Sequence, residues 1–207
     1  RPMTTNFDSI SALLGAPVDA PPALDALGTP RALDAESYPY ETGTLFHGPA
    51  FQALTHLFEG ASGASGLLDA APGTVPAGRL NPRLLDAATH IIPHEDLQRW
   101  TDKVPAGVVA YPALITDLDI YGPTPVSGQI RVEARFDGFL GGPDHPAFKL
   151  QLIAGGQVWV QLRLVEATFP KGPLGEAEPG ARRAFLRDGA FVDGLRLSRH
   201  ADGETRL

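Results

Sequence analysis

Residues 130–137 alternate strictly between apolar side chains at even positions and charged ones at odd positions. A period of two is typical of a strand with one buried and one solvated face, so we expect the charged side chains to face solvent. The same alternation returns over 158–164, and 148–153 gives another strand between them. Gly155-Gly156 joins 148–153 to 158–164 and is the kind of dipeptide that a tight hairpin requires. The sequence therefore predicts an antiparallel sheet.

A helix precedes these strands and carries the polar residues of most interest. The Asn-Pro pair at 81–82 suits a helix start, since Asn caps well and the first position needs no N–H. We expect the helix to run from this pair to about Trp100, ended or kinked by Pro93. Asp86 and His90 are four residues apart and share one face. One helix followed by long antiparallel strands indicates an α+β fold in which a curved sheet wraps a central helix.

The remaining segments suggest a domain with an extension at each end. Residues 1–40 form a Pro/Ala-rich arm or linker on the surface. Residues 41–170 form the domain, in which 51–58 and 64–68 pair as a hairpin and 114–121 is a further strand. Residues 171–207 are polar and Gly-rich and form a C-terminal extension. The chain begins with Arg rather than Met, as expected for a piece of something longer.

Composition narrows the function classes. The 17 basic and 24 acidic side chains leave a net charge of −7, with no basic stripe, which argues against nucleic acid or an anionic membrane as partner. The absence of cysteine excludes disulfides, a thiolate nucleophile and Cys-based zinc sites. No apolar run approaches the roughly 20 residues of a membrane span. We therefore expect a cytoplasmic protein.

Two short runs resemble a known family. Leu-Phe-His-Gly-Pro-Ala-Phe-Gln at 45–52 and Leu-Leu-Asp-Ala-Ala-Thr-His at 84–90 resemble the C-terminal half of dehydratase domains from polyketide synthases and polyunsaturated fatty acid synthases. Those domains carry a Tyr-Gly-Pro-x-Phe motif and then Asp-x-x-x-Gln/His on the central helix of a hotdog fold. The resemblance spans about Tyr40 to Phe169. It implies a single hotdog or half of a double hotdog.

The resemblance also implies roles for individual residues. Dehydration of a β-hydroxyacyl thioester needs a base for the α proton and an acid for the departing hydroxyl. Asp86 would be the acid, if burial raises its pKa, and His90 would hold it or the leaving hydroxyl. Five residues would contact the substrate: His47, Gly48, Pro49, Phe51 and Tyr111. Of these, His47 takes the place of the family's usual Tyr, and the Gly-Pro pair would shape the tunnel wall.

The family's base histidine has no counterpart in this chain. It lies in an N-terminal hotdog within His-x-x-x-Gly-x-x-x-x-Pro, and none of the six His residues begins that pattern. The first half could lie outside this chain, a second chain could complete the site, or the domain could be degenerate and kept for architecture. Recruiting His47 or His94 as the base requires an additional assumption. Whether the chain is an enzyme by itself therefore stays open.

These observations leave a choice of functions. The first is a dehydratase that converts β-hydroxyacyl chains on the phosphopantetheine arm of acyl carrier protein to trans-2-enoyl thioesters, with no cofactor of its own. The second is a pseudo-dehydratase that serves as scaffold or carrier-docking domain, and the third is a hotdog thioesterase. Expected partners are acyl carrier protein, neighbouring synthase domains and a pairing hotdog, in a homodimer for a lone half. We expect no metal, because Pro93 separates His90 from His94 and no third ligand is evident.

Overall fold

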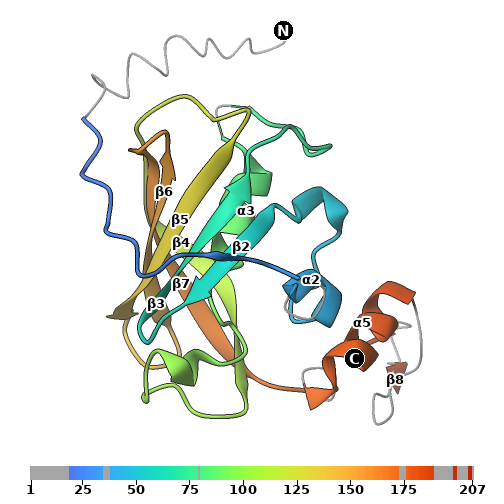
Figure 1. Cartoon of the computed structure of the whole chain (residues 1–207). Helices are drawn as coiled ribbons and strands as arrows, with labels where there is room; N and C mark the ends of the chain where they lie inside the picture. The colour runs from blue at the N-terminus through green and yellow to red at the C-terminus, as the bar shows by residue number, and fades with distance from the viewer. Residues whose placement is uncertain are drawn as a thin grey trace, which may run out of the picture.

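The computed structural model describes residues 19–34, 38–78, 80–172, 176–188, 198–199 and 205–206 (Figure 1). Residues 1–18 of the arm and much of the C-terminal extension lie outside this part. A seven-stranded antiparallel sheet has the order β1-β2-β3-β5-β6-β7-β4. Its strands are β1 (Arg31–Ala32), β2 (Leu54–Glu59), β3 (Gly63–Asp69), β4 (Val108–Ile120), β5 (Gln129–Phe139), β6 (Pro146–Ala154) and β7 (Gln157–Pro170). A small second pair comprises β8 (Ser198–Arg199) and β9 (Thr205–Arg206).

Short helices accompany the sheet. They are α2 (Pro39–Thr42), the 3₁₀ turn η1 (Pro49–Phe51), α3 (Pro82–Thr89), the 3₁₀ turn η2 (Leu97–Arg99) and α5 (Pro179–Asp188). The expected boundary at residue 40 falls inside α2. None of the helices in the described ranges is long and apolar enough to cross a membrane.

The predicted strands are confirmed, and their register explains the core. Leu150 lies opposite both Ala134 on β5 and Leu162 on β7, so apolar side chains from three strands meet on one face. These side chains are at most 2% exposed. Gly155 and Gly156, at φ 57° and 82°, make the turn between β6 and β7 in a conformation that other residues rarely adopt. The side chains that alternate in the sequence therefore lie alternately on the inner and the outer face of the sheet.

The outer face differs from the expectation, because it is not left to solvent. The described part of the arm crosses it on the side away from α3 (Figure 1, blue). The Leu24 N–H donates to Gln151 Oε1 at 2.8 Å, and Arg131 donates to the Leu24 carbonyl at 2.9 Å. The Leu27 N–H donates to a carboxylate oxygen of Glu133, which is completely buried. The polar side chains of this face bind the backbone of the arm.

Helix α3 fills the inner face. The Asn81 side chain caps it by accepting from the Leu84 N–H at 3.3 Å. Leu84, Ala87 and Ala88 are fully buried against the sheet. The turn that follows the helix also packs closely on the sheet, since a Cβ on Gly66 would come within 2.8 Å of the Ile91 side chain. This packing turns the opposite side of the helix, which carries Asp86, away from the sheet.

The buried guanidinium of Arg83 fixes the start of this helix. It donates to the carbonyl oxygens of Asp69 at 2.8 Å, Ala71 at 3.2 Å and Gln52 at 3.5 Å. One cation therefore joins α3 to the end of β3 and to the segment that follows η1. Buried acceptors need such partners, because an unsatisfied carbonyl costs about 1–3 kcal/mol.

The expectation that the helix runs to about Trp100 was wrong, since α3 ends at Thr89. Pro93 has no N–H and cannot donate to the Thr89 carbonyl four residues earlier. The side chain of His94 occupies that role instead, with its Nε2 3.0 Å from the Thr89 oxygen. The chain therefore leaves the helix one turn before the proline, and His94 does not continue the face that carries His90.

The far edge of the sheet exposes a band of apolar side chains. Within the described residues β4 pairs with β7 alone. The exposed side chains on or beside it are 37–51% accessible: Tyr111, Leu114, Ile115, Leu118, Ile120 and, on β7, Phe169. We call these six residues the β4 edge. A long apolar edge strand invites pairing with another chain or domain, as the sequence analysis expected of a lone hotdog half.

Candidate active site

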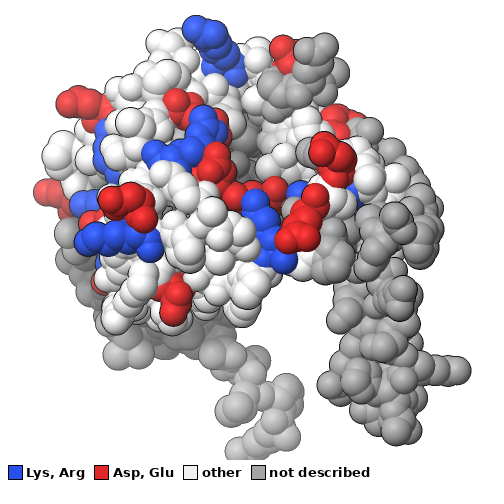
Figure 2. All heavy atoms as spheres, turned by 90° about the horizontal axis from the view of Figure 1, so that it is seen from below, with Lys and Arg blue, Asp and Glu red and all other residues white. Residues whose placement is uncertain are grey.

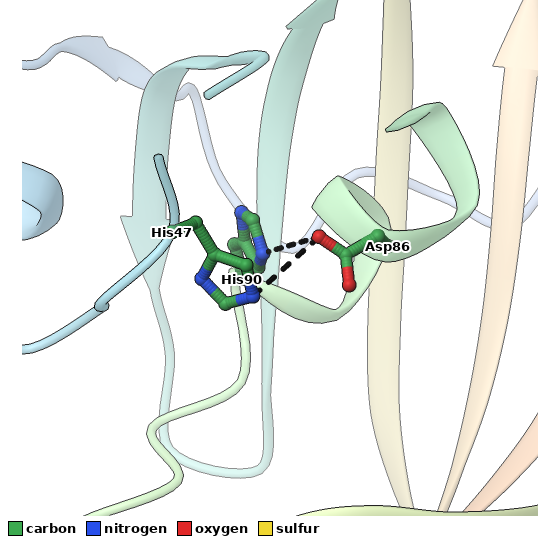
Figure 3. Close-up of side chains that lie close together, drawn as sticks. All are labelled: His47, Asp86 and His90. Carbon is green, nitrogen blue, oxygen red and sulfur yellow. Dashed lines mark ion pairs between the residues drawn. The ribbon is translucent and has the colours of Figure 1, made fainter. Parts of the chain in front are cut away.

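Three polar side chains converge at the helix (Figure 3). His90 Nε2 lies 3.1 Å from Asp86 Oδ2, and His47 Nε2 lies 3.5 Å from the same oxygen. The two imidazole rings are 4.0 Å apart between centroids and tilted by 44°. The structure thus unites both predicted catalytic residues with one predicted substrate-binding residue.

Different elements deliver these side chains. Asp86 and His90 come from one turn of α3, with His90 as the C-cap residue. His47 comes from the loop between α2 and η1, where the Gln52 side chain donates to the His47 carbonyl at 2.8 Å. Arg83 on α3 donates to the Gln52 carbonyl. These hydrogen bonds fix the position of the loop relative to the helix.

Tyr40 positions the buried His90, although nothing in the sequence pointed to it. Its hydroxyl lies 2.6 Å from His90 Nδ1 and accepts from the Leu54 N–H at 3.4 Å. Burial raises the pKa of Tyr40 well above its usual range, so it is a neutral phenol. The hydroxyl hydrogen is then available to His90 Nδ1, which leaves the His90 Nε2–H facing Asp86. No motif marks Tyr40, because it sits in the segment that composition assigns to the arm.

Burial lowers the pKa of both His47 and His90. The charge of His94 lowers both further, while the Asp86 carboxylate opposes the shift. The two imidazoles are therefore neutral near pH 7, each with one nitrogen able to accept a proton or bind a cation. Their exposure differs, since the side chain of His90 is completely buried and that of His47 is 34% exposed.

His94 belongs to a separate buried ion pair. Its Nδ1 lies 2.8 Å from Glu166 Oε1, and its Nε2 faces the Thr89 carbonyl. Since both nitrogens face acceptors, both carry hydrogen. Burial alone would lower the pKa of His94, but the Glu166 carboxylate outweighs it and raises that pKa. His94 is thus an imidazolium with no lone pair, which rules it out as base or as a metal ligand beside His90.

The expected burial of Asp86 is not provided by the described part of this chain. Its side chain is 36% exposed. A carboxyl that stays protonated near neutral pH needs an environment of low polarity. Further covering would have to come from substrate or from another domain.

The other predicted substrate-binding residues divide into two groups. Gly48, Pro49 and Phe51 follow His47 through η1, and Gly48 borders open space, since an added Cβ would meet nothing within 4 Å. Tyr111 lies on the β4 edge, where its ring contacts that of Phe169 at 6.1 Å between centroids. Their contact with a substrate stays a prediction.

A cavity of about 640 Å³ lies next to the cluster, between β1, β2, α2 and the loop 92–99. His90 lines it, whereas His47 and Asp86 do not. Its wall is mixed. It includes six charged residues, Arg31, Asp34, Glu59, Glu95, Asp96 and Arg99, and seven apolar ones, Ala32, Leu33, Pro39, Leu45, Leu57, Ile92 and Pro93. Figure 2, which views the molecule from below, shows acidic and basic side chains of the described residues interspersed on the visible surface.

Comparison with known proteins supports the fold. The sequence matches no protein-family model and no curated protein. The structure is similar to the dehydratase domain of the CurH module of curacin polyketide synthase (TM-score 0.54, 17% identity, 75% of this chain and 56% of that one). It is also similar to the RzxB dehydratase domain from Pseudomonas fluorescens (0.50, 21%, 72% and 54%) and to a pyran synthase domain of the sorangicin pathway (0.52, 22%, 76% and 58%).

These similarities confirm the hotdog α+β fold predicted from the sequence. At 17–22% identity they carry the fold and leave the chemistry to the residues of this chain. The chain spans little more than half the length of each of these dehydratase and pyran synthase structures.

Proposed function

We propose that the chain is a dehydratase-type hotdog domain acting on β-hydroxyacyl thioesters. The observation that carries this proposal is the Asp86 carboxylate placed between two neutral imidazoles on the helix of a hotdog. When protonated, Asp86 is the proton donor that the elimination of water requires, and His90 is the group that holds it.

The reaction would proceed as an elimination. A base removes the α proton, the electron pair forms the Cα–Cβ double bond, and the Cβ–O bond breaks as protonated Asp86 gives its proton to the departing hydroxyl. The His90 Nε2–H, held in place by Tyr40, would orient the Asp86 carboxyl or the leaving hydroxyl. The base then gives the proton from Cα to solvent, and Asp86 takes up a proton from solvent, so both groups return to their starting states.

We assign the base to a second hotdog that pairs along the β4 edge. Exposed apolar side chains line that edge. The chain matches 56% of the CurH dehydratase domain, and the second hotdog would correspond to the unmatched part of such a domain. Pairing would also bury apolar surface, which stabilises the pair by about 25 cal/mol per Å². If the second hotdog extends as far as Asp86, it would also reduce the exposure of that side chain. His47 is the alternative base within the chain, because its neutral imidazole lies beside the acid.

The remaining parts of the proposal follow from the substrate. The acyl chain would arrive on the phosphopantetheine arm of an acyl carrier protein within a polyketide or polyunsaturated fatty acid synthase. Neighbouring synthase domains would be further partners, and the site would use no cofactor of its own. A cytoplasmic location is part of the same proposal.

The test compares two preparations. The longest natural polypeptide that carries this sequence, and the 207-residue chain alone, are incubated with 3-hydroxyacyl pantetheine thioesters, and mass spectrometry follows the loss of water. We expect dehydration by the longer polypeptide, loss of most turnover in Asp86→Asn, and none of that loss in Asp102→Asn, whose residue is exposed in a distant turn.

Other outcomes are diagnostic. Turnover by the chain alone that disappears in His47→Phe would assign the base to His47. Release of free acid would indicate a thioesterase, and binding without turnover in both preparations would indicate a scaffold. Turnover that survives Asp86→Asn would refute the assignment of the acid.

A further inference from the structure

We propose that His47, Asp86 and His90 form a binding site for a divalent metal ion of the zinc type. Each residue offers one donor atom, and the three atoms lie within 4.8 Å of one another. In the sequence, His90 and His94 have no evident third metal ligand. In the structure His47 lies beside His90, because the loop before η1 brings it to the helix.

The distances suit small-ion coordination. Ligands bound tetrahedrally to zinc, at roughly 2.0–2.2 Å from the ion, lie about 3.4 Å from one another. The two distances to Asp86 Oδ2 are 3.1 Å from His90 and 3.5 Å from His47. Asp86 and His90 have the i, i+4 spacing that places two ligands on one helical face. Any remaining adjustment falls on His47, which lies on a loop beside the open space at Gly48.

The donor atoms are also poised chemically. Asp86 Oδ2 and the buried His90 Nε2 lie 3.1 Å apart, and their contact is an ion pair rather than a well-formed hydrogen bond. Both imidazoles are neutral near pH 7, as a ligand nitrogen must be. The nearby imidazolium of His94 is offset by Glu166, so it does not leave a net positive charge against an incoming cation.

Tyr40 supplies the outer support that metal-binding histidines normally have. A ligating His usually donates its other N–H to an oxygen, which fixes the ring. His90 Nδ1 lies 2.6 Å from the Tyr40 hydroxyl. On metal binding the proton of neutral His90 moves from Nε2 to Nδ1, so that Nε2 is free to bind the ion and Nδ1–H donates to the Tyr40 oxygen.

The site leaves coordination positions on its outer side. The side chains of His47 and Asp86 are about one-third exposed, whereas His90 is buried. A metal held by three protein ligands with water in the fourth position is an open site. Two imidazoles and a carboxylate favour Zn²⁺, Co²⁺ or Ni²⁺ over Mg²⁺ or Ca²⁺, which prefer oxygen alone.

One consequence rests on the proposed function: a bound ion would occupy the Asp86 oxygen that dehydration needs. Zinc should therefore inhibit turnover. Binding itself is independent of turnover, so the proposal is tested by binding.

The experiment uses the untagged, metal-stripped chain. Titration calorimetry with Zn²⁺ should show one site per chain, and Co²⁺ should give the intense visible absorption of a low-symmetry, four- or five-coordinate ion. His47→Phe, Asp86→Asn and His90→Gln should each weaken Zn²⁺ binding by about 100-fold or more. Tyr40→Phe should weaken it by roughly 10–100-fold, the usual effect of removing an outer partner. The control is His145→Gln, at an exposed hairpin position.

Zinc should also raise the melting temperature of the wild type and of His145→Gln but not of the three ligand variants, which separates lost binding from lost folding. The proposal is overturned if the wild type shows no saturable Zn²⁺ binding, or if two of the ligand variants bind as tightly as the wild type. A failed dehydration assay leaves these readouts unaffected, and failed zinc binding leaves the dehydration assay unaffected.

Discussion

Replacing His94 with glutamine tests the buried ion pair that ends the helix. The change removes the cation beside Glu166 and one of the two donors to the Thr89 carbonyl, the other being the Ile92 N–H. Breaking a buried pair from one side costs about 3–5 kcal/mol, because the remaining charge is left without compensation. The glutamine amide can still reach one of the two acceptors, so we expect a loss near the lower end, about 3 kcal/mol.

The pH dependence gives a second signature of the same pair. The pKa of His94 is raised in the folded chain, so the folded state binds its proton more tightly than the unfolded state. The stabilisation is complete below the unfolded pKa of about 6.5 and is lost as the pH rises through the raised pKa. Wild-type stability should therefore fall as the pH rises above 6.5, and His94→Gln should lack this component.

Urea unfolding followed by circular dichroism, over pH 6–9, measures both effects. Glu166→Gln should lose less than His94→Gln, because it leaves a neutral histidine instead of an unpaired carboxylate. His56→Gln is the control, since His56 is half-buried on β2 and has no acidic partner among the described contacts. A loss below about 1 kcal/mol in His94→Gln, or an unchanged pH profile, would refute the assignment of a buried imidazolium.

Three further predictions concern other parts of the chain. Arg83→Met should destabilise the fold by about 2–4 kcal/mol, since three carbonyl groups lose their donor; urea unfolding measures it, and a loss under 0.5 kcal/mol, the typical size of a neutral surface change, would contradict it. Tyr40→Phe should cost about 1 kcal/mol and reduce dehydration in kcat more than in KM, and an unchanged kcat would remove Tyr40 from the site. The chain should sediment as a homodimer at micromolar concentration, and Leu114→Glu with Leu118→Glu should give a monomer; a clean wild-type monomer near 21.9 kDa would contradict pairing along the β4 edge.

The sequence predicted the sheet well because alternation and the Gly155-Gly156 turn are local signals. It placed the helix start correctly for the same reason, since the Asn81 cap and Pro82 act within one turn. The helix end was missed because its cause is partly tertiary: Pro93 cannot make the next helical hydrogen bond to the Thr89 carbonyl, which accepts instead from the Ile92 N–H and from His94, itself held by Glu166 from β7.

The candidate site was predictable in part. Asp86 and His90 belong together through helical spacing alone, whereas His47 lies about 40 residues away and was linked to them through the family resemblance. Tyr40 escaped notice because a single tyrosine in a Pro-rich segment has no periodicity. Its contact with His90 depends on where α2 packs.

The arm that crosses the outer face of the sheet has an evolutionary consequence. Gln151, Arg131 and Glu133 bind its backbone amides and carbonyls rather than its side chains. The route of the arm is therefore encoded in the strands beneath it. We expect related chains to keep these three residues while the sequence between 19 and 27 varies. An alignment would then show a variable linker and three conserved polar positions on the strands that it crosses.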